Sequence, residues 1–206
     1  MTKKQADLES AYALKSPQDN RRLYAGWAES YDQDFATRMG FRMPALIAAR
    51  FEGVGPVLDV GAGTGLLGQA LAARGIGPID GIDISTEMLA VARGKSVYRD
   101  LIEADLTQPL TLPCTAYHGI VSSGTFTHGH VGPQAIEALL GVAAPGAQFV
   151  LSILAGIYVS AGFEAMLGAL AGRITLPQIV EERIYDAAPD AAHRDDTCLI
   201  VTFRTL

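Results

Sequence analysis

The chain has 206 residues, of which 49% are hydrophobic and 18% are charged. This composition is typical of a globular protein with one core. The 16 Lys and Arg residues face 22 Asp and Glu residues, which gives a formal net charge of -6. That charge has the wrong sign for a general binder of phosphate backbones, so we expect no nucleic-acid partner.

Targeting signals, disulfides and metal sites are not expected either. The first residues mix both charges and lack the apolar segment of a signal peptide, which predicts a cytoplasmic protein. Cys114 and Cys198 stand far apart in the sequence, without His residues at metal-ligand spacing, and predict free thiols. The uncharged segment 138–163 is long enough for a membrane span, but Pro145–Gly146 interrupts it and predicts a turn between a helix and a strand.

The N-terminal part of the chain is predicted to be helical. Helix-forming residues mixed with charge occupy Lys3–Lys15 and Gln18–Ala28, and Ser16–Pro17 between them is typical of a helix start. A third helix is expected over Met43–Phe51. We interpret residues 1–52 as a helical cap on the core that follows.

Strands and helices then alternate, which predicts right-handed crossovers and a doubly wound, mostly parallel sheet. The C-terminal part changes character, because a helix at Phe163–Leu170 is followed by two β-rich runs that predict an antiparallel pair. The expected strands are 57–60, 79–84, 101–105, 119–123, 148–154, 179–185 and 198–204, and the expected helices between them are 66–74, the segment from its cap Ser85 to about 92, and 133–142.

These elements predict a single domain, residues 1–206, with an α/β, Rossmann-like fold. Its sheet would have seven strands, the last one antiparallel. Residues 53–154 would form the cofactor-binding core, and residues 155–206 a lid helix with the C-terminal strands.

The most informative segment is Val57–Gly68, where glycines stand between a buried strand and a helix. Glycine allows a sharp turn and a close approach to a ligand, and a helix N-terminus presents unpaired N–H groups to anions. Gly63, Gly65 and Gly68 also satisfy the dinucleotide fingerprint, with Asp83 about 20 residues further on. The glycines alone therefore do not distinguish a dinucleotide from other nucleotide ligands.

Acidic residues distinguish these ligand classes. Asp59 lies within the first strand, Asp83 ends the second and Asp105 ends the third. A pyrophosphate needs positive partners, whereas carboxylates suit hydroxyls, an amine and a cation. S-adenosylmethionine carries all three groups, so the acids favour it over a dinucleotide.

Four segments, Asp59–Gly65, Gly81–Ser85, Glu103–Leu106 and Ala144–Ser152, resemble in order the motifs of class I S-adenosylmethionine-dependent methyltransferases. Tyr24–Asp34 is similar, more narrowly, to methyltransferase-like proteins of the Williams-Beuren syndrome chromosome region 27 type. For Trp27 and Tyr31, packing in the core is the alternative to cofactor binding. The resemblance implies S-adenosylmethionine as cofactor, with Trp27 and Tyr31 over its methionine end and the glycine loop, Gly61, Gly63 and Gly65, next to its methionine part. Asp59 would support this loop or contact the amino group, directly or through water, and Ser122 would lie near the cofactor amine. Asp83 would bind the ribose, and the adenine would be bound by Ile84, Met88, Asp105 and Leu106.

The acceptor side is less defined. His118 departs from the family pattern, which usually has an acid there. His128 and His130 follow the fourth strand and are the candidate bases, because imidazole titrates near neutrality; solvated loop residues are the alternative. Arg38 and Arg42 would either bind an anionic group of the substrate or lie on a solvated face of the protein.

The leading hypothesis is an enzyme that transfers a methyl group from S-adenosylmethionine to an oxygen, nitrogen or sulfur atom of a small-molecule acceptor. A non-catalytic S-adenosylmethionine-binding protein is the second hypothesis. An NAD(P)-dependent oxidoreductase, which the glycine spacing permits, is the third.

Overall fold

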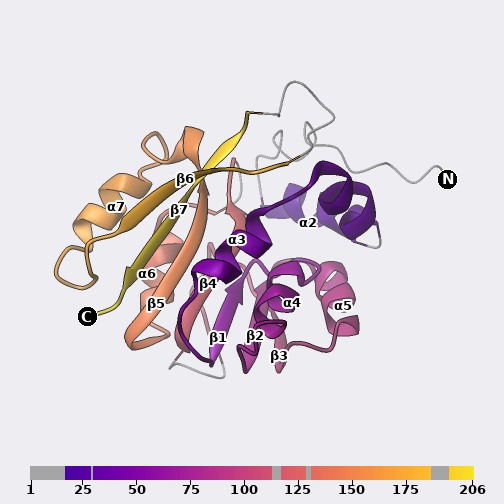
Figure 1. Ribbon diagram of the computed structural model, residues 1–206, viewed down its shortest axis with the longest axis horizontal. Coiled ribbons are helices and arrows are strands. Elements are labelled where there is room, and N and C mark those ends of the chain that lie inside the picture. Colours follow the sequence, from indigo (N-terminus) through magenta and orange to yellow (C-terminus); the bar gives the residue numbers. More distant parts are fainter. Residues whose placement is uncertain (1–16, 29, 113–116, 129–130, 187–194) are drawn as a thin grey trace.

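The computed structural model describes residues 17–28, 30–112, 117–128, 131–186 and 195–206. The strands of this part form one seven-stranded sheet, with α3 in front of it and α6 behind it (Figure 1). The predicted helix Lys3–Lys15 lies outside the described residues. In chain order the elements are α2 (Pro17–Trp27), the π-helix η1 (Tyr31–Thr37), α3 (Met43–Arg50), β1 (Val57–Val60), α4 (Leu66–Ala72), β2 (Ile79–Asp83), α5 (Thr86–Gly94), β3 (Asp100–Glu103), β4 (Tyr117–Phe126), α6 (Gln134–Leu140), β5 (Ala143–Leu154), the 3-10 helix η2 (Ala155–Ile157), α7 (Phe163–Ala169), β6 (Gln178–Arg183) and β7 (Thr197–Arg204).

The order of the strands determines where a ligand can bind. They lie in the order β3-β2-β1-β4-β5-β7-β6, parallel from β3 to β5, with β7 antiparallel to both β5 and β6. The prediction of a mostly parallel sheet with an antiparallel last strand is confirmed. From β1 the chain goes first to β2 and β3 on one side and then to β4 and β5 on the other. Open sheets of this kind bind ligands at the carboxyl ends of the strands where the order reverses, which is the end of β1.

Local chemistry explains most of the element boundaries. All four residues of β1 are buried, as in a strand covered on both faces. Ser85 caps α5 as predicted, since its hydroxyl accepts a hydrogen bond from the backbone N–H of Met88. The glycine at the start of α4, Gly65, has a φ of 89° that a residue with a side chain rarely adopts.

Two segments differ from the expectation. The π-helix η1 occupies Tyr31–Thr37, a segment between two predicted helices in which no helix was expected. Strand β5 begins before Pro145–Gly146, because Ala143 already pairs with Tyr117. The Pro-Gly pair therefore forms an irregularity within a strand, and the turn expected between a helix and a strand is not there.

The uncharged segment 138–163 is divided among α6, β5 and η2, and no helix in the described ranges has the length and apolar character needed to cross a membrane. Cys198 is a buried free thiol, whereas Cys114 lies outside the described residues.

Candidate active site

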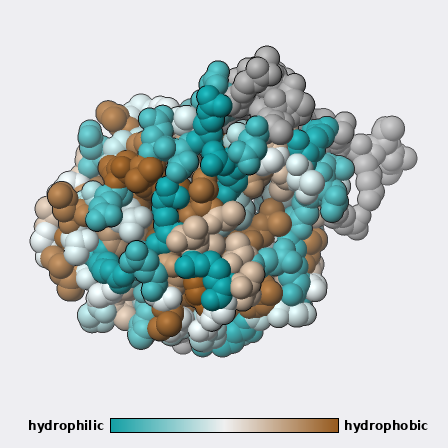
Figure 2. Space-filling model, in the orientation of Figure 1, coloured by the Kyte–Doolittle hydropathy of each residue, from teal (hydrophilic) through white to brown (hydrophobic). Residues whose placement is uncertain are grey.

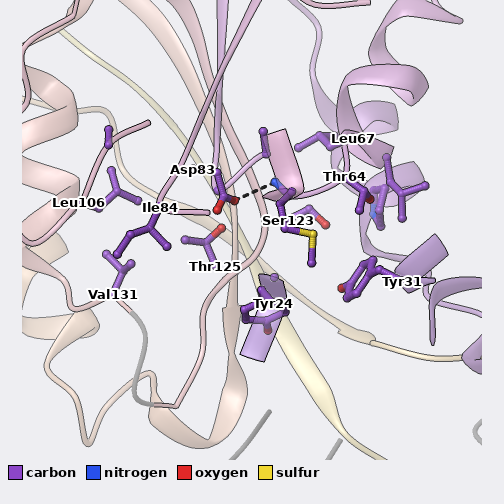
Figure 3. Close-up of a pocket in the computed structure, with 18 of the residues that line it drawn as sticks. Tyr24, Tyr31, Thr64, Leu67, Asp83, Ile84, Leu106, Ser123, Thr125 and Val131 are labelled. Atoms are coloured by element: carbon purple, nitrogen blue, oxygen red, sulfur yellow. Dashed lines mark hydrogen bonds between the residues drawn. The ribbon is translucent and has the colours of Figure 1, made fainter. Parts of the chain in front are cut away.

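A cleft with about 970 Å³ of space not filled by atoms opens at the carboxyl ends of the central strands. Parallel strands β1, β2, β3 and β4 all deliver their following loops to this edge, and α2, η1 and the start of α3 close it from the N-terminal side (Figures 1 and 3). Its described lining residues are Tyr24, Tyr31, Phe41, Pro44, Gly61, Ala62, Gly63, Thr64, Leu66, Leu67, Asp83, Ile84, Met88, Ala104, Asp105, Leu106, Thr107, Ser123, Gly124, Thr125 and Val131.

The glycine-rich loop forms the centre of the cleft, and its first two glycines serve different purposes. Both have positive φ angles, 69° at Gly61 and 54° at Gly63. A Cβ added at Gly61 would lie 2.0 Å from Thr125 Oγ1, so that glycine is required by protein packing. A Cβ at Gly63 would have no atom within 4 Å. The loop therefore leaves open space at Gly63, where a ligand can approach the backbone closely.

Asp83 is held in the cleft by the backbone. Its Oδ2 accepts a hydrogen bond of 2.8 Å from the N–H of Gly63, and its Oδ1 accepts one of 2.9 Å from the N–H of Ser85. Burial raises the pKa of Asp83, and these backbone hydrogen bonds act in the opposite direction. Each carboxylate oxygen can accept a second hydrogen bond, so the pair of oxygens suits a ligand with two neighbouring hydroxyls.

The side of the cleft next to β3 is an apolar slot with one acid at its end. Ile84, Met88 and Leu106 line the slot (Figure 3 labels Ile84 and Leu106). Asp105 Oδ1 accepts hydrogen bonds from the backbone N–H and the hydroxyl of Thr107. Because both bonds go to Oδ1, Oδ2 can accept from an exocyclic amine. These are the residues that the resemblance implied for the adenine, and in the structure they line the same cleft.

Asp59 and Gly65 belong to a layer beneath the loop and do not line the cleft. The side chain of Tyr98 packs where Gly65 and Gly68 lack side chains, and its hydroxyl donates a 2.7 Å hydrogen bond to Asp59 Oδ2. Burial raises the pKa of Asp59 to about 7, against the opposing effect of that hydrogen bond. Tyr98 was not among the site residues expected from the sequence, although the glycines at 65, 68 and 81, all close to its ring, were a signal that a large side chain occupies this layer.

The aromatic residues of the N-terminal segment divide between the cleft and the core. Tyr31 lines the cleft, and so does Tyr24, which the sequence analysis did not select (Figure 3). Trp27 is buried in the hydrophobic core and packs edge-on against Tyr24, with ring centroids 5.6 Å apart. Burial, together with the charge of Asp83, raises the pKa of Tyr24, so its phenol stays neutral and can donate a hydrogen bond.

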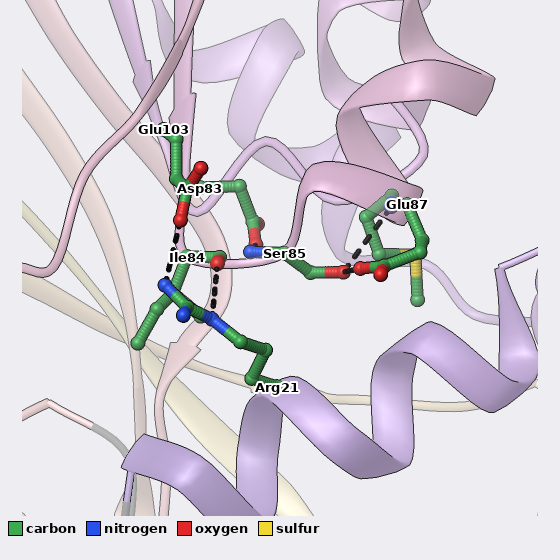
Figure 4. Close-up of polar contacts among 7 residues, drawn as sticks. Arg21, Asp83, Ile84, Ser85, Glu87 and Glu103 are labelled. Atoms are coloured by element: carbon green, nitrogen blue, oxygen red, sulfur yellow. Dashed lines mark hydrogen bonds and ion pairs between the residues drawn. The ribbon is translucent and has the colours of Figure 1, made fainter.

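Two sets of polar contacts fix this N-terminal segment over the cleft. In η1, Asp32 accepts a hydrogen bond of 2.6 Å from the Thr64 hydroxyl through Oδ1 and forms an ion pair of 2.6 Å with Lys95 Nζ through Oδ2. In α2, Arg21 donates to the carbonyl of Ile84 and pairs with Glu103 (Figure 4). Arg21 and Tyr24 are three residues apart and share a helix face, so the Arg21 contacts direct Tyr24 toward the cleft.

At the end of β4, two hydroxyls are already used by the fold. Ser122 and Thr125 both donate to the carbonyl oxygen of Val60, at 2.7 and 2.9 Å. Ser122 is fully buried and does not line the cleft, whereas its neighbour Ser123 does. Ser123 Oγ is buried and has no hydrogen-bond partner among the described residues.

Three further candidates, Arg38, Arg42 and His128, are not part of the described lining. His128 is exposed beyond the end of β4, and His130 falls outside the described residues. Arg42 forms ion pairs with Glu182 and Asp186, which directs its charge toward the C-terminal strands. Arg38 is exposed on the surface.

The charge of the lining indicates what kind of nucleotide fits. Among the described lining residues, the charged ones are Asp83 and Asp105, and none is basic. A nucleoside with a free amine and a positive charge is compatible with this set of donors and acceptors, and the open space at Gly63 leaves room for it. The residues present therefore fit S-adenosylmethionine, whereas a pyrophosphate would meet no cationic side chain in the described lining.

Comparison with known proteins agrees with this geometry. Residues 57–146 match the methyltransferase domain family. Methyltransferase-like protein 27 of Homo sapiens is 31% identical to this chain over 142 residues, which are 65% of this chain and 58% of the human protein. The matched region thus spans a little over half of the length of that relative.

Solved structures share the fold. The putative methyltransferase in complex with the Haloferax volcanii Trm112 methyltransferase activator has a TM-score of 0.63 and 17% identity, over 88% of this chain and 96% of its own. A TehB-like SAM-dependent methyltransferase from Corynebacterium glutamicum has a TM-score of 0.62 and 19% identity, over 87% and 98% of the two chains. The domain match over residues 57–146, the human relative and the fold therefore show that this chain is similar to S-adenosylmethionine-dependent methyltransferases.

Proposed function

We propose that this protein transfers the methyl group of S-adenosylmethionine to an oxygen, nitrogen or sulfur atom of a small molecule. The observation that carries the proposal is the position of Asp83 and Asp105, whose carboxylates line one cleft on either side of an apolar slot, with the open backbone of Gly63 beside them. This arrangement supports binding of a nucleoside that has two hydroxyls and an exocyclic amine.

In this proposal the chain's own residues bind, orient and exclude water. When bound, S-adenosylmethionine supplies a methyl group on a positively charged sulfur. Asp83 accepts hydrogen bonds from the ribose hydroxyls while the N–H groups of Gly63 and Ser85 keep its carboxylate in place. Tyr24 and Tyr31 cover the glycine loop and keep water from the reacting atoms, which favours an in-line displacement.

A proton must leave the acceptor when its nucleophilic atom carries one. We assign this role to His128 or His130, which follow β4 in the sequence. A protein that binds the cofactor without catalysis would have the same residues around the nucleoside. Turnover of an acceptor therefore separates an enzyme from a binding protein.

Calorimetric titration tests the cofactor part of the proposal. We expect S-adenosylhomocysteine to bind with micromolar affinity and NAD and NADP not to bind. Asp83→Asn removes the charge and one acceptor oxygen, so it should weaken S-adenosylhomocysteine binding by roughly 10- to 100-fold. Asp100→Asn, an exposed change on the neighbouring strand β3, is the matched control and should leave the affinity unchanged. Binding of NAD, or equal affinities for wild type and Asp83→Asn, would overturn the proposal.

An acceptor screen tests the catalytic part. The assay follows formation of S-adenosylhomocysteine from S-adenosylmethionine across phenols, carboxylates, amines and thiols. Turnover stimulated by one class supports the enzyme. Tight cofactor binding without stimulation by any class supports the binding protein.

A further inference from the structure

We infer, on the basis of the proposed function, that the methyl acceptor is an uncharged and largely apolar small molecule, and that the hydroxyl of Ser123 forms its polar contact. This inference concerns the part of the cleft that the nucleoside does not need. It rests on three observations: the position of the charged lining residues, the neutralisation of nearby charges, and the unused hydroxyl at the end of β4.

The sheet order divides the cleft into two sides, with the glycine loop after β1 between them. The side of β2 and β3 holds both charged residues of the described lining, Asp83 and Asp105. The side of β4, which we call the acceptor side, is lined by Phe41, Pro44, Ser123, Gly124 and Thr125. With the nucleoside on the side of the carboxylates, the acceptor side remains for the second substrate, and its described lining is neutral.

The acceptor side is also shaped for apolar contact. Phe41 stacks at an angle against Tyr185, with ring centroids 5.9 Å apart, so the ring is supported from behind. A Cβ at Gly124 would lie 3.4 Å from the Cζ atom of Phe41, which shows that the ring reaches the end of β4. Phe41 and Gly124 thus form one continuous wall of the acceptor side.

Charges close to this side are paired with one another. Arg42, next to Phe41, pairs with Glu182 and Asp186. Asp32, next to Tyr31, pairs with Lys95. A carboxylate or ammonium group of an acceptor would lose its hydration on entering and would meet no opposite charge in the described lining of this side, which makes its burial unfavourable.

Of the hydroxyl groups at the end of β4, that of Ser123 is the one left to form the polar contact with the acceptor. Ser122 and Thr125 both donate to the Val60 carbonyl, so their protons are in use. Ser123 Oγ is buried without a partner in the described part of the chain, although the residue lines the cleft (Figure 3). A buried hydroxyl without a partner is unfavourable, and rotation about its Cα–Cβ bond lets it meet a ligand. A serine hydroxyl both donates and accepts, so it suits a neutral hydroxyl, thiol or amide.

The test measures binding of four ligands of similar shape to the protein saturated with S-adenosylhomocysteine, by ligand-detected NMR with titration. The ligands are 2-naphthol, naphthalene, 2-naphthoate and 2-naphthylmethylammonium. We expect 2-naphthol to bind most tightly and both charged ligands at least tenfold more weakly. Ser123→Ala should weaken 2-naphthol about 3- to 10-fold and leave naphthalene unchanged. Ser160→Ala, an exposed change on the surface, is the matched control.

The following results of this binding test would contradict the inference. Equal or tighter binding of a charged ligand would overturn the neutral acceptor, as would no binding of any of the four. A loss of S-adenosylhomocysteine affinity in Ser123→Ala would place the hydroxyl at the cofactor instead. Failure of the wild-type protein to bind S-adenosylhomocysteine would contradict the proposed function itself, so the two failures are distinguishable.

Discussion

The hydroxyl of Tyr98 donates a 2.7 Å hydrogen bond to the carboxylate of Asp59, directly beneath the glycine-rich loop. The ring of Tyr98 fills the space that Gly65 and Gly68 leave, because a Cβ at either position would lie within 2.9 Å of that ring or its hydroxyl. The contact joins the first strand to a segment 39 residues later. The glycine-rich loop therefore rests on a buried acid and a partly buried phenol.

Burial of Asp59 makes the stability of the protein depend on pH. Burial raises the pKa of Asp59 from 3.8 to about 7 in the folded state. The folded protein thus binds a proton that the unfolded chain has released, and its stability falls as the pH rises from about 4 to about 7, by up to roughly 1.4 kcal/mol per pH unit. Asp59→Asn removes this dependence. We therefore expect Asp59→Asn to be more stable relative to wild type at pH 8 than at pH 5, as measured by the free energy of unfolding in urea.

The control for this prediction is Tyr98→Phe, which removes the hydrogen bond that lowers the pKa of Asp59. Its loss of stability relative to wild type should be larger at pH 8 than at pH 5. Parallel pH profiles for wild type and Asp59→Asn would show that Asp59 does not titrate in this range.

Alanine substitutions at two glycines of the loop should have different effects: one should mainly destabilise the fold, and the other should mainly weaken ligand binding. Gly61→Ala should destabilise the fold by about 2 to 5 kcal/mol, because its Cβ would collide with Thr125 at a strained φ. Gly63→Ala should cost only about 1 to 2 kcal/mol, since its Cβ meets no atom within 4 Å. In Gly63→Ala the methyl group instead occupies ligand space, so S-adenosylhomocysteine affinity should fall about tenfold or more. Wild-type affinity in folded Gly63→Ala would remove this loop from the ligand contacts.

His128→Ala and His130→Ala test the assignment of a base. If either imidazole accepts the acceptor's proton, its removal should lower kcat by roughly 100-fold or more. The calorimetric affinity for S-adenosylhomocysteine should remain unchanged in both variants, because neither residue belongs to the proposed nucleoside contacts. Wild-type rates in both variants would mean that the acceptor loses its proton to water or carries none.

Many of the residues that we propose to contact the nucleoside could be predicted from the sequence. Asp83 and Asp105 each stand at the end of a predicted strand, and parallel strands bring such ends to one edge of the sheet. Gly63, Ile84 and Leu106 could be predicted in the same way, because they too lie at or soon after the ends of predicted strands. These contacts are local to the strand-loop-helix units, where spacing along the chain determines position in space.

The other contacts depend on details that a pattern does not contain. Side chains alternate along a strand, so choosing Ser122 rather than Ser123 moves the hydroxyl from the cleft to the sheet interior. Tyr24 rather than Trp27 faces the cleft because Arg21 fixes the rotation of α2 through contacts with Ile84 and Glu103. Such long-range contacts leave no periodic signal in the sequence.

The bridge from Asp32 to Thr64 and Lys95 predicts coupling between the N-terminal segment and the glycine loop. Lys95 is mostly buried, with 12% of its side chain exposed, so Asp32→Asn leaves a nearly buried ammonium without its carboxylate. Because Asp32 itself is about one-third exposed, we expect a moderate loss of about 1 to 2 kcal/mol in the free energy of unfolding. Displacement of Tyr31 should also weaken S-adenosylhomocysteine binding several-fold.

A double-mutant cycle separates this bridge from a general effect of substitution in η1. Lys95→Met removes the charge that Asp32 neutralises, so the combined variant should lose less stability than the sum of the two single variants, with a coupling energy of about 0.5 to 2 kcal/mol. Asp34→Asn, in the same π-helix, has no side-chain ion pair within the described ranges and should change neither stability nor affinity. Additive losses at Asp32 and Lys95, or an equal loss in Asp34→Asn, would mean that the ion pair does not join η1 to the end of α5.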